Sequence, residues 1–220
     1  MDKPIRTRRK EERPGEILDA AFEEFVQKGY AATRLEDVAV RAGVTKGTIY
    51  FYFQNKERVF VTMVRELSRP VVAQAEQFLA EKAHETTDLP DFLRLYLRFF
   101  YQTIVTDRRA GEILRLLIAE AGRFPELVDE HFQTLVGPAL AMLHEVLADG
   151  MKRGILRSSP AAEFPVLLLA PALQLNIWLL AYANRRPVDI AQHCEAAIDL
   201  ILKGLLPRSD AAPSGADANE

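Results

Sequence analysis

Apolar residues recur every three or four positions along almost the whole 220-residue chain. This spacing is typical of amphipathic α-helices, because residues three and four apart share one helix face. No stretch alternates convincingly like a β-strand, so an all-α fold is predicted. The first such pattern runs from Glu12 to Lys28 and stops at Gly29. Later helical patterns cover 89–105, 110–122, 125–152, 163–183 and 189–206.

Three short helix signals follow one another closely between residues 33 and 60. Thr33-Arg34-Leu35-Glu36 has the form of a capping box and predicts a short helix that ends at Gly43. Thr45 can cap a third helix over 46–53, and Asn55 can cap a fourth, which Pro70 bends or ends. Two short helices joined by a tight, glycine-containing turn form a helix-turn-helix.

The third of these helices contains Ile49-Tyr50-Phe51-Tyr52-Phe53, whose composition by itself favours a strand. Ile49 and Phe53 lie four positions apart and can anchor one helix face in a core, while Tyr50 and Tyr52 turn outward. A phenolic hydroxyl can reach a phosphate oxygen, and a DNA major groove is wide enough to admit a helix. The segment is therefore interpreted as the end of a recognition helix.

Charge is distributed unevenly, although the formal net charge is only −3. Residues 1–58 contain 12 Lys and Arg against 10 Asp and Glu, and residues 59–220 contain 16 against 21. Much of the basic excess lies in residues 1–11, which read either as a solvated, disordered arm or as an arm that contacts phosphates. The polar tail 207–220 is predicted to be disordered.

The segment from Thr33 to Phe60 resembles the DNA-binding domain of the TetR family of bacterial transcriptional regulators. The resemblance rests on Gly43-Val44-Thr45, Lys46-Gly47-Thr48-Ile49-Tyr50, Tyr52-Phe53 and Asn55-Lys56-Glu57. It implies a helix-turn-helix DNA-binding domain over 12–60 and a helical effector-binding and dimerisation domain over 61–206. It also implies a homodimer that reads a pseudo-palindromic double-stranded DNA operator.

Carried over position by position, the resemblance assigns DNA contacts in and around the second and third helices. Phe51 occupies a position that the family varies and receives no role, and Arg41 reads as a solvated charge more readily than as a contact. Thr33, Thr45 and Asn55 would cap helices in any helical protein, so a DNA contact by Thr33 or Thr45 would be additional. The implied contacts are Thr33, Arg34, Thr45, Lys46, Gly47, Thr48, Tyr50, Tyr52 and Lys56.

The C-terminal half resembles the AefR-like subgroup of this family over Leu114–Phe132, which names no ligand. Aromatic and apolar residues of the middle helices are candidate walls of a largely apolar effector pocket, although each also reads as plain core or surface. The four histidines show no metal-ligand spacing, and neither a metal nor a cofactor is expected. The pocket candidates are Tyr96, Phe99, Phe100, Arg115, Leu117, Glu120, Phe132, Leu135, Asn176 and Trp178.

The apolar stretch 164–183 raises the question of a membrane span, against which Pro165, Pro171, Gln174 and Asn176 count. Family architecture instead pairs the last two helices with those of a second subunit, so no membrane association is expected. Which faces meet the partner cannot be read from the sequence. The candidates for the dimer seam are Leu168, Leu175, Leu179, Ile198, Leu202 and Leu205.

The leading hypothesis is a cytoplasmic, ligand-responsive regulator, expected to be a repressor, with an activator of the same fold as the alternative. The single cysteine, Cys194, fits a reducing compartment. No glycine-rich phosphate loop, His/Cys metal set or nucleophile motif supports an enzyme. A helical adaptor or membrane-associated protein is the remaining alternative.

Overall fold

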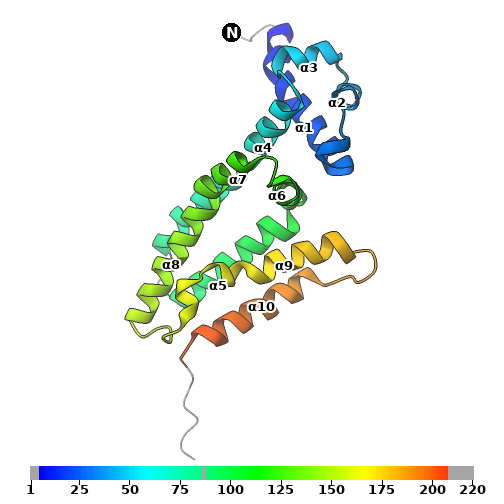
Figure 1. Cartoon of the computed structure of the whole chain (residues 1–220). Helices are drawn as coiled ribbons and strands as arrows, with labels where there is room; N and C mark the ends of the chain where they lie inside the picture. Colours follow the sequence, from blue (N-terminus) through cyan, green and yellow to red (C-terminus); the bar gives the residue numbers. More distant parts are fainter. Residues whose placement is uncertain (1–4, 86–87, 208–220) are drawn as a thin grey trace, which may run out of the picture. The chain divides into compact units, whose positions relative to one another are not determined.

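The computed structural model describes residues 5–85 and 88–207 (Figure 1). Within these ranges every regular element is a helix, which confirms the predicted all-α class. The chain divides into two compact units, one formed by Met1–Ala80 with Asp107–Leu135 and the other by Glu81–Thr106 with Val136–Glu220. The expected DNA-binding domain over 12–60 and the effector-binding and dimerisation domain over 61–206 stay a prediction.

The first unit contains the helix-turn-helix and two later helices. Its elements are α1 (Ile5–Ala32), α2 (Leu35–Arg41), α3 (Lys46–Tyr52), α4 (Lys56–Glu85, as far as Ala80), α6 (Arg108–Glu120) and α7 (Pro125–His131). In Figure 1, α2 and α3 lie beside α1. A five-residue π-helix, η2 (Phe132–Val136), continues α7 and runs past the unit boundary.

Helix α1 starts earlier than the sequence predicts, and it is interrupted at Gly29, where the sequence predicts its end. It begins at Ile5 rather than near Glu12, so residues 5–11 of the expected disordered arm are helical, in keeping with the helix-forming Arg, Lys and Glu of that segment. Gly29 has φ of 75° inside the helix, a conformation that interrupts the α-helical path. Residues 1–4 and 208–220, the rest of the predicted arm and tail, lie outside the described residues.

Four aromatic rings form the centre of the first unit. Phe60 of α4 lies 5.1 Å from both Phe25 and Tyr30 of α1, measured between ring centroids. Phe124, just before α7, lies 5.0 Å from Tyr30 and 5.0 Å from Phe60. All four side chains are buried. Because aromatic rings bury large apolar areas, this cluster ties α1, α4 and the start of α7 into one core.

A buried carboxylate holds α2 against α1. Glu24 of α1 accepts a hydrogen bond from Arg41 Nε at 2.7 Å and lies 2.6 Å from Lys28 Nζ. Lys28 also donates to Asp37 of α2 at 2.9 Å. Hydrogen bonding from Lys28, and then from Arg41, lowers the pKa of Glu24 below its ordinary value of 4.5, against the effect of burial. The solvated role expected for Arg41 is therefore replaced by a structural one.

The predicted capping role of Thr33 is wrong. The residue at the N-cap position of α2 is Arg34, which makes no side-chain capping bond. Thr33 is buried, and its hydroxyl donates to the carbonyl oxygens of Gly29 at 2.7 Å and Glu24 at 3.1 Å. The break in α1 at Gly29 accounts for this, because it frees carbonyl groups near the helix end that need donors.

The second unit is formed by two stretches of the chain, one before α6 and one after η2. Its elements are the last residues of α4, α5 (Leu89–Tyr101), the π-helix η1 (Gln102–Thr106), α8 (Gly137–Lys152), the 3₁₀-helix η3 (Pro160–Glu163), α9 (Val166–Tyr182) and α10 (Ile190–Leu205). Helices α9 and α10 run side by side and both contact α5 (Figure 1). Asn176 of α9 donates to the carbonyl oxygen of Ile104 in η1 at 2.8 Å, which satisfies a π-helical carbonyl.

The structure shows how Pro70 affects α4. Pro70 does not end α4, which continues to Glu85. Pro70 is exposed, so water can hydrogen-bond with the carbonyl left without its helical donor. Among the helices of the described ranges, none is long and apolar enough to cross a membrane.

The residues predicted for the dimer seam are mostly buried inside their own unit. Leu168, Leu175, Ile198, Leu202 and Leu205 are each at most 5% exposed, and Leu179 is half-buried. They lie on the inner faces of α9 and α10. The sequence did not indicate this, because helical spacing identifies an apolar face without showing what covers it. The apolar residues left exposed on the same helices include Leu167, Ile177, Leu180 and Leu200.

Replacing the buried carboxylate tests the α1–α2 network. Glu24→Gln is expected to lower the free energy of unfolding at pH 7 by about 1–3 kcal/mol, because it removes the negative charge and one of the two acceptor oxygens that face Arg41 and Lys28. Chemical denaturation checks this. The matched control is Glu16→Gln, which breaks a surface pair with Arg13 and is expected to cost about 0–1 kcal/mol.

The same carboxylate gives a pH dependence. Because its pKa is lowered by folding, its stabilising contribution is present above the ordinary value of 4.5 and is lost as pH falls through the lower folded value. The stability difference between the wild type and Glu24→Gln should therefore shrink below pH 4.5. An undiminished difference in acid would contradict the ionic role of Glu24.

Candidate nucleic-acid interface

Helix α3 begins at a capping residue, as its sequence predicts. Thr45 has an extended backbone, and its Oγ1 accepts a hydrogen bond from the backbone amide of Thr48 at 3.2 Å. The two threonine hydroxyls lie 2.9 Å apart. A Cβ built at Gly47 would meet only Thr45 Oγ1, at 3.8 Å, so the backbone here is open to close approach. The start of α3 thus offers hydroxyl groups and an uncovered backbone.

The other face of α3 is fixed in the core. Ile49 is fully buried and Phe53, which directly follows the helix, is 6% exposed, as their four-residue spacing predicts. Between them, Tyr50 is 47% and Phe51 74% exposed. Tyr52 is half-buried, and its ring lies 5.0 Å from that of Phe51. Burial of two anchors therefore leaves a polar and aromatic face in solvent.

Lys46, also exposed, is held over this face by two neighbours. Its Nζ forms an ion pair with Glu36 of α2 and lies 5.6 Å from the centroid of the Tyr50 ring. The hydrogen bond to Glu36 raises the pKa of Lys46 and lowers that of Glu36. Both side chains are half-exposed, so the pair is weak enough to exchange for a phosphate.

Lys56 has a different environment from the one expected of a phosphate clamp. Its Nζ donates to the carbonyl oxygens of Tyr30 at 2.8 Å, Ala31 at 3.1 Å and Thr33 at 3.0 Å. It also lies 4.5 Å from the centroid of the Tyr30 ring. All three ammonium donors are thus directed at the end of α1, where unpaired carbonyls favour a cation.

The remaining predicted contacts divide by exposure. Arg34 is exposed at the start of α2, whereas the side chain of Thr33 is buried and engaged. Asn55 caps α4, accepting from the backbone amide of Arg58 at 2.8 Å. The structure therefore exposes Thr45, Lys46, Gly47 and Tyr50 on α3 beside the half-buried Thr48, and leaves Thr33 and Lys56 in supporting positions.

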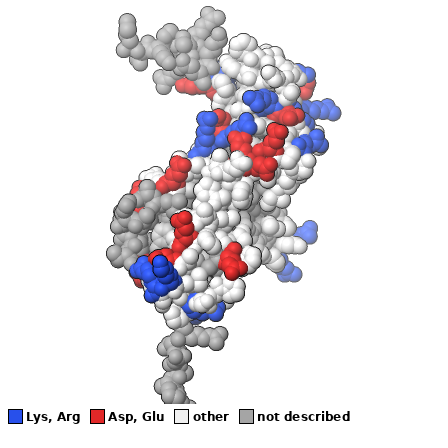
Figure 2. All heavy atoms as spheres, turned by 60° about the vertical axis from the view of Figure 1, so that its left-hand side comes forward, with Lys and Arg blue, Asp and Glu red and all other residues white. Residues whose placement is uncertain are grey.

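The first unit carries ion pairs between α1 and α6 that the sequence did not indicate. Arg108 makes two hydrogen bonds to Glu23, each 2.9 Å long, and Arg109 lies 3.1 Å from Asp19. On the face in Figure 2, basic and acidic side chains are interspersed over this unit. Pairing of this kind depends on which helices become neighbours, so no local sequence signal reveals it.

The ten predicted pocket residues fall in both units and do not form one described cavity. In the first unit, Leu117 is core, Phe132 is 52% exposed, Leu135 is half-buried, and Arg115 donates to Glu112 at 2.6 Å and to the carbonyl of Val26 at 3.0 Å. Glu120 pairs with Arg123 at 3.4 Å.

In the second unit, burial raises the pKa of Tyr96 to about 12, which keeps its hydroxyl protonated. Phe99 and Phe100 are half-buried, and Trp178 donates to the carbonyl of Arg186 at 3.2 Å. Asn176 is used by η1, as described above. These side chains remain a prediction for an effector pocket.

Comparison with known families matches both halves of the chain. Residues 17–63 match the family described as bacterial regulatory proteins, tetR family. Residues 91–204 match the C-terminal domain described as that of AefR-like transcriptional repressors.

Individual relatives cover most of the chain at low identity. The fatty acid metabolism regulator protein of Bacillus subtilis is 23% identical over 200 residues, covering 89% of this chain and 98% of its own. A probable acrEF/envCD operon repressor of Escherichia coli is 25% identical over 197 residues, covering 87% and 86%. A crystal structure of a putative transcriptional regulator from Saccharomonospora viridis, in complex with choline, has a TM-score of 0.73 and 21% identity, covering 90% and 100%.

The environment of Lys56 gives a prediction about stability. Lys56→Ala is expected to lower the free energy of unfolding by about 1–3 kcal/mol, because the carbonyls at the end of α1 lose a charged donor. The matched control is Arg58→Ala in the same helical turn, where the exposed side chain has no hydrogen-bond or ion-pair partner among the described residues. Equal stability of both variants, measured by chemical denaturation, would contradict the anchoring role.

Proposed function

Because the chain belongs to the TetR family of bacterial regulatory proteins, we propose that it is a ligand-responsive transcriptional repressor that binds a pseudo-palindromic DNA operator as a homodimer. The observation that carries the proposal is the divided surface of α3. Ile49 and Phe53 are buried, while Thr45, Lys46 and Tyr50 are exposed. A repressor rather than an activator is favoured by the AefR-like repressor domain that residues 91–204 match.

Each exposed group of α3 has a chemical role in this proposal. The hydroxyls of Thr45 and Thr48 donate to or accept from base edges and phosphates, and Gly47 lets the backbone approach the groove. Lys46 exchanges Glu36 for a phosphate, and the Tyr50 hydroxyl donates to another. Lys56 acts indirectly, by holding the end of α1 in place. Thr33 acts in the same indirect way.

Dimerisation is assigned to the exposed apolar side chains of α9 and α10. Ile177 is 58% and Leu200 73% exposed, and Leu167 and Leu180 are also exposed. Apolar groups gathered on one pair of helices gain free energy when a second copy removes them from water. A two-fold symmetric dimer presents two copies of α3, and a palindromic operator mirrors that symmetry.

Release follows from population shift. One conformation of the dimer holds the two α3 helices about 34–36 Å apart, the length of one DNA turn, and so engages both half-sites. An effector that binds more tightly to a conformation with a different distance between the two α3 helices lowers the fraction of dimers that fit the operator. The ligand thereby changes gene expression without touching DNA.

Selection of bound genomic DNA tests the DNA-binding role. The wild-type chain should enrich fragments that share an inverted repeat, with an affinity that falls steeply as salt concentration rises. Tyr50→Ala should weaken binding at least about tenfold, because it removes a charge-assisted hydrogen bond in each subunit. Gel-shift titration measures the loss.

The control for this experiment is Ile118→Ala, which truncates a 61% exposed side chain on α6 and should leave affinity unchanged. Circular dichroism confirms that both variants are folded. Wild-type affinity for DNA in the Tyr50→Ala variant would contradict the proposed recognition face.

The dimer face gives a separate prediction. Leu200→Glu and Ile177→Glu should shift the chain from dimer to monomer in sedimentation velocity, because each places two carboxylates in an apolar interface. Ile118→Glu, at an equally exposed position of α6, should remain dimeric. A monomeric wild type, or dimers of unchanged stability in both α9 and α10 variants, would refute the assignment.

A further inference from the structure

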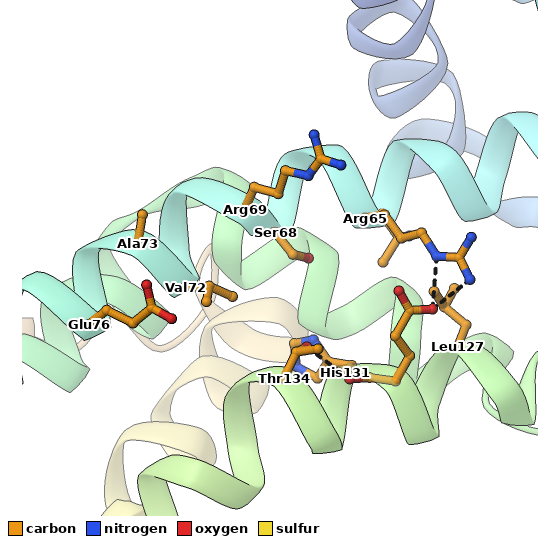
Figure 3. Close-up of a pocket in the computed structure, with 11 residues that line it drawn as sticks. Arg65, Ser68, Arg69, Val72, Ala73, Glu76, Leu127, His131 and Thr134 are labelled. Atoms are coloured by element: carbon orange, nitrogen blue, oxygen red, sulfur yellow. Dashed lines mark hydrogen bonds and ion pairs between the residues drawn. The ribbon is translucent and has the colours of Figure 1, made fainter.

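A cavity of about 330 Å³ lies in the first unit between α4 and the stretch formed by α7 and η2 (Figure 3). This volume is at the lower end of the range of about 300–1,000 Å³ that is usual for small-molecule sites. Apolar side chains form much of its wall, among them Val64, Val72, Ala73 and Leu127. None of the pocket residues predicted from the sequence lines it.

Two polar side chains in the wall are Ser68 and His131. The hydroxyl oxygen of Ser68 is buried and has no hydrogen-bond partner within the described part of the chain. His131 also lines the cavity, and burial lowers the pKa of its ring, so the ring is neutral at pH 7. A buried hydroxyl without a hydrogen-bond partner is unfavourable and uncommon in folded proteins, so this wall differs from ordinary core.

The charged groups that face the cavity give it a net negative character. At one end, Arg65 donates from two nitrogens to Oε2 of Glu130, at 2.8 and 2.6 Å, so these two charges cancel. Arg69 points away from the cavity in Figure 3 and pairs with Glu66. At the other end, the exposed side chain of Glu76 turns its carboxylate along the mouth of the cavity and has no ion-pair or hydrogen-bond partner among the described residues.

The backbone of the cavity wall is also unusual. Thr134, which lines the site, belongs to the π-helix η2, and its hydroxyl donates to the carbonyl of Glu130 at 2.8 Å. Short π-helical segments are rare and are frequently found at functional sites. The opposite wall is α4, whose first residue, Lys56, anchors α1.

We propose that this cavity binds a small, mainly apolar molecule with one basic nitrogen, which points toward Glu76 while its body lies against Val72 and Leu127. The effect of ligand binding on DNA binding rests on the proposed regulatory function. A ligand against residues 65–76 contacts α4, the helix that supports α1 and α3.

Calorimetric titration of the full chain with three matched probes tests the ligand class. The probes are 4-propylbenzylamine, 4-propylbenzyl alcohol and 4-propylbenzoate, which differ mainly in the charge of one group. The amine should bind about tenfold more tightly than the alcohol, because it forms a charge-assisted hydrogen bond to Glu76, and the benzoate should bind most weakly. Equal or tighter binding of the benzoate would overturn the assignment.

Two pairs of variants locate the binding. Glu76→Gln should reduce amine affinity to that of the alcohol, whereas Asp129→Asn, which removes a charge on α7 outside the lining, should not. Val72→Trp, at a half-buried position of the lining, should fill the cavity and abolish binding of the amine and the alcohol, whereas Ala119→Trp, at an exposed position of α6, should preserve both. Undiminished amine binding by Val72→Trp would place the ligand elsewhere and refute the site.

The amine is then added to the complex with selected DNA. Loss of DNA retention in the wild type, and its persistence in Val72→Trp, would support the effector role, and unchanged retention in the wild type would refute that role. A chain that binds the amine in calorimetry but enriches no DNA would overturn the proposed function while supporting the cavity. The two failures are therefore distinguishable.

Discussion

The end of helix α1 is held against α4 by four aromatic rings and one ammonium group, and the placement of α2 and α3 depends on that contact. The rings of Phe25, Tyr30, Phe60 and Phe124 pack at centroid distances of 5.0 to 5.8 Å. Beside them, Lys56 donates to three carbonyl oxygens that the helix end would otherwise leave without protein donors. The aromatic cluster removes apolar surface from water, and the hydrogen bonds of Lys56 fix the orientation of the end of α1. Together they fix the frame on which α2 and α3 are placed.

Helix α3 is short, and its composition favours a strand, so tertiary anchoring decides its structure. Two buried side chains, Ile49 and Phe53, replace the helical propensity that the segment lacks. The rigid attachment leaves the turn around Gly47 uncovered and Tyr50 in solvent. Because a site held by a packed scaffold loses less conformational entropy on binding, this arrangement suits DNA recognition.

Several features could be predicted from the sequence because they are local. The all-α class follows from residue spacing, and the caps at Thr45 and Asn55 depend only on the next three residues.

Other features could not be predicted from the sequence, because they depend on which helices meet. The hydroxyl of Thr33 turns back to α1 once Gly29 breaks that helix, and Lys56 reaches carbonyls more than 20 positions away in the chain. The helical spacing likewise placed Leu175 and Ile198 on apolar helix faces, but it did not show that packing within one chain buries them. The cavity exists only because α7 lies opposite α4.

The central claim, that the exposed face of α3 lies on DNA, is tested most directly by photo-crosslinking. A benzophenone amino acid replaces Phe51, which is 74% exposed, or Ile118, which is 61% exposed on α6. Each protein is irradiated with genomic DNA fragments, and the attached fragments are sequenced. The account predicts efficient crosslinks from position 51 to fragments that share an inverted repeat, and background crosslinking from position 118. Equal yields from the two positions, or fragments without a shared sequence, would contradict it.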